Sequence, residues 1–147
     1  PLRRRTGRYS QAMRVAVGSD EDAPLVGAVV RHLEERGHAV DLTPLGAPWP
    51  EVGRSVGERV ASGRADRGVV CCWTGTGVSI AANKVPGVRA ALCGDAVTAD
   101  GARRWNDANV LALSLRATTE TVAAEILDAF LSGSPDPAEA ASIAAVE

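Results

Sequence analysis

The hydrophobic positions of the chain follow two alternating spacings. Short, continuous apolar runs that end at turn residues are typical of strands buried on both faces of a sheet. Five such runs are expected to be strands, at residues 14–17, 39–42, 68–72, 88–93 and 110–113. Between them, apolar residues recur every three or four positions, as at Leu25, Val29 and Leu33, which predicts amphipathic helices.

One helix is expected after each strand. We expect one to end near Gly37, one to contain Val52, Val56 and Val60, one to run to about Lys84, one to about Trp105, one to cover 119–131, and a short Ala-rich helix to lie beyond Pro137. Strands that alternate with helices form a parallel sheet covered on both faces, because the crossovers are right-handed. The predicted fold is α/β: a Rossmann-like three-layer sandwich with a five-stranded parallel sheet, in a single domain over residues 13–147.

The ends of the strands are where function is sought. Ligands of such folds bind at the carboxyl ends of the strands, where the strand order reverses, so the loops 18–24, 72–79 and 93–109 are the candidates. The first twelve residues carry Arg3, Arg4, Arg5 and Arg8 without an apolar period. We interpret residues 1–12 as a disordered arm or the remnant of a cloning tag.

Composition excludes several classes of protein. The 147 residues are 46% hydrophobic and 23% charged, an ordinary globular balance. Lys and Arg number 16 against 18 acids, a net charge of −2, so no basic surplus favours nucleic acid. No apolar run is long enough for a membrane span, and no secretion signal precedes the first strand. We expect a cytoplasmic protein that binds neither nucleic acid nor membrane.

The cysteines and histidines indicate neither disulfides nor a metal site. Cys71, Cys72 and Cys93 cannot all pair, and adjacent cysteines rarely meet disulfide geometry, which favours a reducing compartment. His32 and His38 stand outside any metal-ligand spacing, and no Cys-x-x-Cys pair exists. No metal is expected.

The turn after the third strand carries the candidate chemistry. Residues 72–79, Cys-Trp-Thr-Gly-Thr-Gly-Val-Ser, lead from a buried strand into a helix. Glycines there let backbone N–H groups point at an anion, and the helix dipole adds positive potential. Two other interpretations stay open. The segment can be a tight turn that binds nothing. It can also be a dinucleotide loop with Asp95 downstream, although it follows the third strand and Ile80 replaces the last glycine.

Three separated segments resemble one known family. They are Cys72-x-Thr74-Gly75-x-Gly77-x-Ser79 continuing to Lys84, then residues 87–91, then Asn106-Asp107-x-Asn109 continuing to Ala112. Together with Gly18-Ser19-Asp20, they are similar to the ribose-5-phosphate isomerase B and galactose-6-phosphate isomerase family of aldose–ketose isomerases. The resemblance extends from about residue 13 to residue 131.

The resemblance implies a mechanism. Cys72 matches the family's base, which moves a proton between C1 and C2 of an open-chain sugar through an enediolate, and a thiol beside a helix N-terminus has its thiolate favoured. Thr74 would bind the sugar or assist proton transfer, and Cys71 would be a buried apolar neighbour. The residues implied as catalytic are Cys72 and Thr74, and those implied for substrate binding are Asp20, Glu21, Trp49, Trp73, Gly75, Thr76, Gly77, Ser79, Trp105, Asn106 and Arg116.

The sequence departs from the family where phosphate binds. Glu21 stands where the family commonly has a phosphate-binding His, and its charge would repel a dianion. No Arg or Lys follows Arg116, whereas relatives draw phosphate-binding arginines from the C-terminal segment of a partner subunit. Arg116 itself matches a phosphate-contacting position, so one cation is expected for that group.

Tryptophans mark the other departures. The chain has only one Tyr, one Phe and three Trp. Trp105 replaces the family's ring-opening His, and an indole N–H cannot shuttle a proton near neutral pH. Trp73 replaces a glycine, and Trp49-Pro50 falls where the family has Tyr-Pro. An apolar site rebuilt with tryptophan is therefore expected.

Two hypotheses follow from the resemblance. The first is an aldose–ketose isomerase of a sugar phosphate or a related open-chain sugar, which uses Cys72 as base and needs no cofactor. The second is a catalytically altered member that serves as a ligand-binding or assembly module with a Trp-lined pocket. In both, the resemblance implies a homodimer or a dimer of dimers, because the family's site is shared between subunits.

Overall fold

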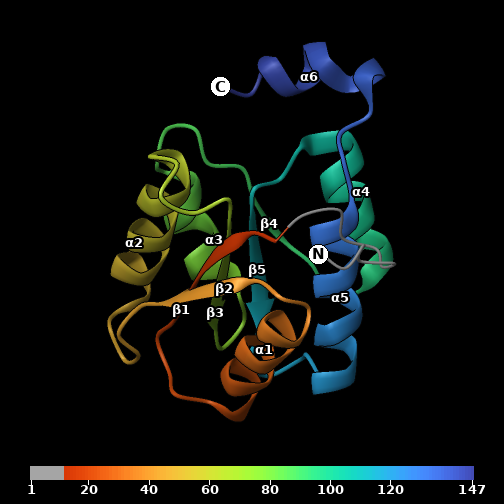
Figure 1. Cartoon of the computed structure of the whole chain (residues 1–147). Helices are drawn as coiled ribbons and strands as arrows, with labels where there is room; N and C mark the ends of the chain where they lie inside the picture. Colours follow the sequence, from red (N-terminus) through yellow and green to blue (C-terminus); the bar gives the residue numbers. More distant parts are fainter. Residues whose placement is uncertain (1–11) are drawn as a thin grey trace, which may run out of the picture.

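A five-stranded sheet with helices on both faces forms the protein. The structure is a computed structural model that describes residues 12–147 (Figure 1). The strands are β1 (Arg14–Ser19), β2 (Ala39–Leu42), β3 (Arg67–Cys72), β4 (Ala90–Leu92) and β5 (Val110–Ser114). They lie in the order β2-β1-β3-β5-β4, and every neighbouring pair is parallel. The predicted α/β class and the five-stranded parallel sheet are confirmed.

Helices connect the strands in the predicted alternation. They are α1 (Pro24–Glu35), α2 (Trp49–Ala61), α3 (Thr76–Asn83), α4 (Ala96–Asn106), α5 (Glu120–Ser132) and α6 (Ala140–Ala144), with a 3-10 turn at Pro137–Glu139. Side-chain caps fix the starts of two of these helices. Asp95 accepts a hydrogen bond from the Thr98 N–H at 2.7 Å and caps α4, and Thr119 caps α5 through the Val122 N–H at 3.2 Å.

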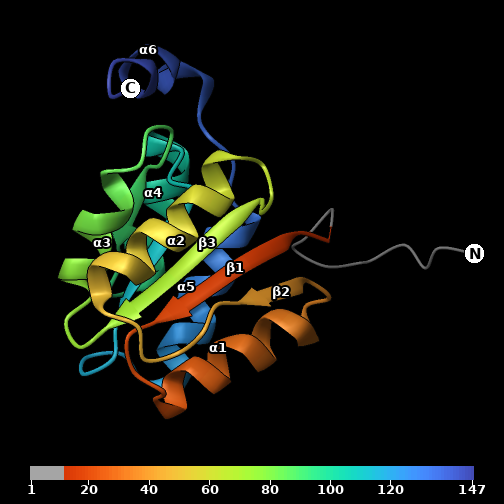
Figure 2. The same cartoon turned by 90° about the vertical axis from the view of Figure 1, so that its left-hand side faces the viewer.

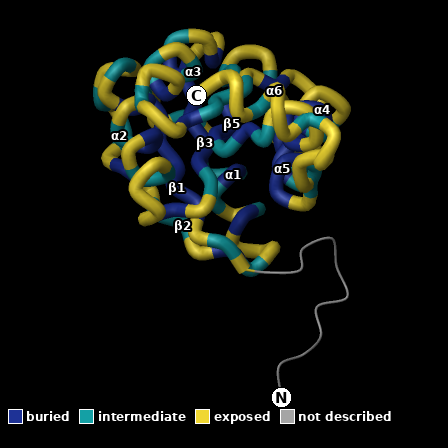
Figure 3. Tube along the Cα trace, turned by 90° about the horizontal axis from the view of Figure 1, so that it is seen from above, coloured by how far each residue is buried: buried dark blue, intermediate teal, exposed yellow. Residues whose placement is uncertain are grey.

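The core has two layers, one on each face of the sheet. Helices α1, α4 and α5 cover one face, where Leu33, Ile126 and Phe130 pack on strand residues such as Leu111. Helices α2 and α3 cover the other face, where Val56 packs with its neighbours. Figure 2 shows α2 and α3 on one side of β1 and β3 and α1 on the other, and Figure 3 shows the buried segments gathered along the central strands. The three-layer sandwich is therefore confirmed.

Strand β4 is shorter than the sequence predicts. The apolar run 88–93 suggests six residues, but only three pair with β5. The Val88 N–H closes a turn onto the Val85 carbonyl at 3.1 Å, and β4 lies at the edge of the sheet with half-exposed Ala90 and Ala91. Strand β4 pairs with β5 alone, and this pairing covers only the middle three residues of the apolar run. The predicted arm at 1–12 lies outside the described residues, apart from Ala12.

Two glycines bring α2 and α3 into close contact. A Cβ atom at Gly53 would lie 2.6 Å from the Ala81 Cβ and 2.8 Å from the Val78 carbonyl oxygen, and one at Gly57 would lie 3.0 Å from the Val85 side chain. Only hydrogen fits between the two helices at Gly53. This close approach carries the first turn of α2 up to the start of α3.

Helices long and apolar enough to span a membrane do not occur among residues 12–147.

Candidate active site

The crossovers of the sheet reverse between β1 and β3. From β1 the chain passes through α1 to β2 on one side, and from β2 it returns through α2 to β3 on the other face. The carboxyl ends of β1 and β3 are neighbours in register, with Ser19 beside Cys71. The Asp20 N–H reaches the Cys71 carbonyl at 3.4 Å. This is the switch point at which open α/β sheets bind ligands.

Cys72 is the last residue of β3 and lies at this switch point. Its side chain is 6% exposed and packs on the α2/α3 side of the sheet with Val78. Cys71 points to the opposite face, where burial, with smaller effects from Cys72 and Asp20, raises the pKa of its thiol to about 12. The three cysteines are free thiols. Successive side chains of a strand point to opposite faces, so Cys72 and its buried neighbour Cys71 have different environments.

Burial makes the third thiol a poor base as well. Cys93 follows β4 and is 1% exposed. Its burial, with a smaller effect from the nearby Asp95 carboxylate, raises the pKa of its thiol to about 11. Both Cys71 and Cys93 therefore remain protonated near neutral pH.

The turn after Cys72 exposes backbone donors. Gly75 has φ +76°, and a Cβ atom there would lie 2.6 Å from Leu92 Cδ1 and 3.0 Å from the Leu113 carbonyl oxygen, so glycine is required. Helix α3 begins at Thr76. The first N–H groups of a helix have no carbonyl partner within it and carry positive potential. The Thr74 and Thr76 hydroxyls share a hydrogen bond of 2.7 Å. This arrangement can hold a negatively charged oxygen beside Cys72.

Trp49 and Trp73 flank the turn. Trp49 begins α2, and its indole lies on Gly77, where an added Cβ would come within 2.9 Å of two ring atoms. Its side chain is 45% exposed and that of Trp73 is 58% exposed. Ser79, two residues after Gly77, donates its N–H to the Gly75 carbonyl at 3.3 Å. Two of the three tryptophans thus border the Cys72 turn and leave apolar surface open to a ligand.

The chain after β5 is bonded to the same turn. The Leu115 N–H donates to the Cys72 carbonyl at 2.9 Å, and the Arg116 N–H to the Trp73 carbonyl at 3.1 Å. The Ser114 hydroxyl also donates to the Trp73 carbonyl, at 2.9 Å. Arg116 is exposed, so its guanidinium is available to an anion at the rim of the site.

The loop after β1 brings acids to the site. The Ser19 hydroxyl donates to the Glu21 carbonyl at 2.7 Å and accepts the Glu21 N–H at 3.2 Å, which folds the loop locally. Asp20 Oδ1 is shielded from solvent and has no hydrogen-bond partner among residues 12–147, so it can accept a ligand hydroxyl. Glu21 is exposed, and α1 begins after Ala23 without a side-chain cap. Glu21 therefore does not cap α1, and its charge is open to solvent next to Asp20.

Trp105 and Asn106 lie at the amino ends of the strands, opposite the carboxyl ends where Cys72 lies. The expectation that the whole loop 93–109 lies at the carboxyl edge is wrong: only the residues up to Asp95 do, because α4 carries the chain back to the start of β5. Cys72 is beside Ser114, and Asn106 precedes Val110. The four residue steps of β5 alone separate the two edges by about 13 Å. A single chain does not bring Asn106 to Cys72.

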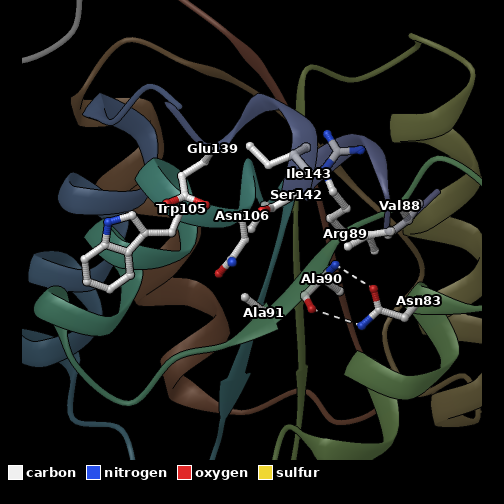
Figure 4. A pocket seen from close by; sticks show the side chains of 12 residues that line it. Asn83, Val88, Arg89, Ala90, Ala91, Trp105, Asn106, Glu139, Ser142 and Ile143 are labelled. Atoms are coloured by element: carbon white, nitrogen blue, oxygen red, sulfur yellow. Dashed lines mark hydrogen bonds between the residues drawn. The ribbon is translucent and has the colours of Figure 1, made fainter. Parts of the chain in front are cut away.

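A pocket of about 570 Å³ lies at the amino ends of the strands, beside Trp105 and Asn106 (Figure 4). Its walls come from the end of α3, the approach to β4, the end of α4 and α6, and they include Asn83, Arg89, Trp105, Asn106 and Ile143. The Asn83 amide is engaged, since it donates to the Ala90 carbonyl at 3.0 Å and accepts the Ala90 N–H at 2.8 Å. Figure 4 shows the Trp105 indole on the side of the pocket away from Asn83 and Arg89.

The ionic contacts beside Asn106 are not predicted by the sequence. Asp107 pairs with Arg103 and with Arg89, and Arg103 is buried. The available signal was the spacing of Arg103 and Asp107, four residues apart at a helix end. No group of three or more His, Cys, Asp or Glu side chains within 12–147 is arranged as a metal site.

The chain matches proteins named as sugar-phosphate isomerases over most of its length. Residues 15–145 match the Ribose/Galactose Isomerase family profile. The chain is 37% identical to galactose-6-phosphate isomerase subunit LacB of Clostridium acetobutylicum, over 85% of this chain and 75% of that protein. It is 34% identical to D-erythrulose-4-phosphate isomerase of Pectobacterium atrosepticum, over 81% of this chain and 82% of that protein.

The fold is shared with solved structures of the same group. Ribose-5-phosphate isomerase B of Clostridium thermocellum superposes with a TM-score of 0.86 at 37% identity, covering 91% of this chain and 95% of that one. The chain belongs to the ribose/galactose isomerase family.

Proposed function

We propose that this protein is an aldose–ketose isomerase that moves a proton between C1 and C2 of an open-chain sugar phosphate, with Cys72 as the base. One observation carries the proposal: the Cys72 thiol ends a central strand at the switch point, directly before the Gly75 turn and the start of α3. The relatives named above are isomerases of galactose-6-phosphate and D-erythrulose-4-phosphate. We assign the activity to one catalytic domain over residues 13–147.

The proposed reaction conserves all atoms. The Cys72 thiolate takes the proton from C2 of the aldose, and the electron pair of that C–H bond forms the C1–C2 double bond of an enediolate. The thiol then returns the proton to C1, and the C2 oxygen becomes the ketose carbonyl. The N–H groups at the start of α3 stabilise the negative oxygen as it forms. Thr74 carries the proton between the two oxygens, and Asp20 holds sugar hydroxyls.

The proposed site needs two copies of the chain. Trp105 and Asn106 are implied by the family resemblance, and they lie an entire strand length away from Cys72 in one chain. A second copy that turns its amino edge toward the Cys72 edge of the first would supply both side chains. In a two-fold dimer the relationship is mutual, so each dimer has two complete sites. We therefore propose a homodimer, or a dimer of dimers, in which Asn106 contacts the substrate's carbonyl oxygen across the interface.

The substrate that suits the site is short or already open. Trp105 cannot relay the proton that opens a sugar ring, and a four-carbon ketose phosphate forms no such ring through its own hydroxyls. The similarity to D-erythrulose-4-phosphate isomerase supports this class. Arg116 is the cation at the rim that would meet the phosphate, and Trp49 and Trp73 would cover the carbon chain.

Proton exchange in deuterated water tests the proposal. The wild type should incorporate deuterium at the carbon next to the carbonyl of at least one of ribose-5-phosphate, galactose-6-phosphate and D-erythrulose-4-phosphate. Cys72→Ala should abolish incorporation, because the base is gone, whereas Cys93→Ala, which also removes a buried thiol, should retain it. Exchange that survives Cys72→Ala would remove Cys72 from the mechanism. Binding of these sugars without any exchange would favour the ligand-binding module.

A further inference from the structure

The residue after Asn106 has a backbone conformation that side chains disfavour. Asp107 is the one non-glycine residue among 12–147 with positive φ, at φ 47° and ψ 45°. This left-handed conformation ends α4 and turns the chain toward β5. Most residues with a Cβ atom disfavour this conformation, and Asp and Asn tolerate it better than the others. The contacts of Asp107 add to that tolerance at the point where α4 ends.

A buried arginine holds Asp107 from within the protein. Arg103 is 2% exposed, and its Nη1 donates to Asp107 Oδ1 at 2.9 Å and to the Ala108 carbonyl at 2.6 Å. Its Nε donates to the Gly133 carbonyl at 3.3 Å, and its guanidinium lies 6.0 Å from the Phe130 ring centroid. Arg103 is thus fixed by α5 and by the chain that follows it.

A second arginine holds Asp107 from the side of β4. Arg89 donates from Nη2 to Asp107 Oδ2 at 3.2 Å and from Nε to the Asp107 carbonyl at 2.8 Å. The backbone is bonded there as well: the Asn109 side chain accepts the Arg89 N–H at 2.8 Å and donates to the Gly87 carbonyl at 2.9 Å. Arg89 also pairs with Glu147 of the C-terminal segment. Both carboxylate oxygens and the carbonyl of Asp107 are therefore engaged.

We propose that Asp107, held between Arg103 and Arg89, is a positioning residue that fixes the Asn106 amide for the active site of the partner copy. The inference rests on the proposed function, and Asp107 itself touches no substrate. Replacing a buried ion pair with apolar residues is often neutral for stability, so the ion pairs of Asp107 are not by themselves evidence of a stabilising role. The contacts fix the backbone next to Asn106, because Asp107 is hydrogen-bonded to Arg103 on one side and to Arg89 on the other.

Asp107→Asn tests the role because it removes the charge but keeps the size and the tolerance for left-handed φ. Asp41→Asn is the matched control. Asp41 also pairs with two arginines, Arg59 at 3.1 Å and Arg64 at 3.9 Å, and is 25% exposed against 31% for Asp107, but it lies on the outer strand β2. Arg89→Gln is the second variant, since it removes the more exposed arginine and leaves the buried pair intact.

Two readouts separate positioning from general stability. The N–H groups of Asp107, Ala108 and Asn109 donate to backbone carbonyls at 3.2, 3.0 and 2.9 Å, so amide hydrogen exchange reports on this loop. In Asp107→Asn, exchange at these three amides should rise at least about tenfold, and kcat should fall roughly 10- to 100-fold with KM nearly unchanged, because small misplacements are costly. Arg89→Gln should show the same pattern more weakly, and Asp41→Asn should change neither.

A double-variant cycle decides whether Asp107 acts through Asn106. Asn106→Ala combined with Asp107→Asn should lower kcat no further than Asn106→Ala alone. Multiplied effects would overturn the proposal, as would wild-type amide exchange at residues 107–109 in Asp107→Asn. A wild type that exchanges no substrate proton would instead overturn the proposed function, and the amide exchange rates would still decide whether Asp107 holds this loop.

Discussion

The indole of Trp49 lies directly on Gly77, so that a Cβ atom at residue 77 would come within 2.9 Å of ring atoms Cδ2 and Cε3. The contact joins the first turn of α2 to the first turn of α3. It depends on the close packing of those helices at Gly53, where an added Cβ would lie 2.8 Å from the Val78 carbonyl oxygen. An aromatic surface is thereby held beside the backbone donors that follow Cys72.

Gly77→Ala should displace this indole and weaken catalysis. The added methyl group must push away either the Trp49 ring or the start of α3, so we expect kcat/KM to fall roughly tenfold or more and tryptophan emission to change. Gly94→Ala is the control, because nothing lies within 4 Å of a Cβ there and its φ is not positive. Unchanged kinetics and emission in Gly77→Ala would show that Trp49 has no role at the site.

Stability should fall at alkaline pH because of two buried thiols. The folded pKa of Cys71 is about 12 and that of Cys93 about 11, both above the ordinary value of 9.0. The folded state thus holds thiol protons that the unfolded state releases. Their stabilisation is complete below about pH 9 and is lost as pH rises toward 11 to 12, with a slope of up to about 1.4 kcal/mol per pH unit for each thiol.

Urea unfolding at several pH values between 8 and 11 measures this loss. The double variant Cys71→Ala/Cys93→Ala should be less stable at pH 8, because it leaves space in the core. Its free energy of unfolding should nevertheless decline less steeply with pH than that of the wild type. Equal slopes for the two proteins would show that other groups govern alkaline unfolding.

The acid at the rim should tune phosphate affinity. Glu21 is exposed, so Glu21→Gln should lower the KM for a sugar phosphate by roughly 1.5- to 5-fold, the range of a surface charge interaction. Arg116→Gln should raise KM instead, and both effects should shrink at high salt. Asp22→Asn provides the control, since Asp22 is also exposed and lies on the same loop. Inhibition constants for inorganic phosphate, measured for all three variants, check the assignment without turnover.

The apolar runs predicted the strands because a parallel sheet covered on both faces leaves a nearly continuous hydrophobic signal. The run at residues 88–93 overstated β4, because pairing at an edge depends on the neighbouring strand and not on hydrophobicity. The Gly75 turn was predictable for a local reason: only glycine tolerates its φ and its close neighbours. Of the four connections between strands, those that follow β1 and β3 hold most of the candidate site residues.

The position of Asn106 and the role of Asp107 required three dimensions. The sequence prediction places the whole of loop 93–109 at the carboxyl ends of the strands, but the helix inside it reverses the chain and moves Asn106 to their amino ends. The pair of Arg103 and Asp107 has the spacing of ordinary surface pairs along a helix, so the sequence alone does not indicate that Arg103 is 2% exposed. The burial of Arg103 depends on α5 and Gly133, which are distant from it along the chain.

Mixing two inactive variants shows whether each active site combines Cys72 of one copy with Asn106 of another. Cys72→Ala and Asn106→Ala are unfolded together in equal amounts, refolded and assayed. Random pairing makes half of the dimers mixed, and each mixed dimer has one site with both residues intact, so about a quarter of the wild-type activity should return. Activity no higher than that of the separate variants would contradict the shared site.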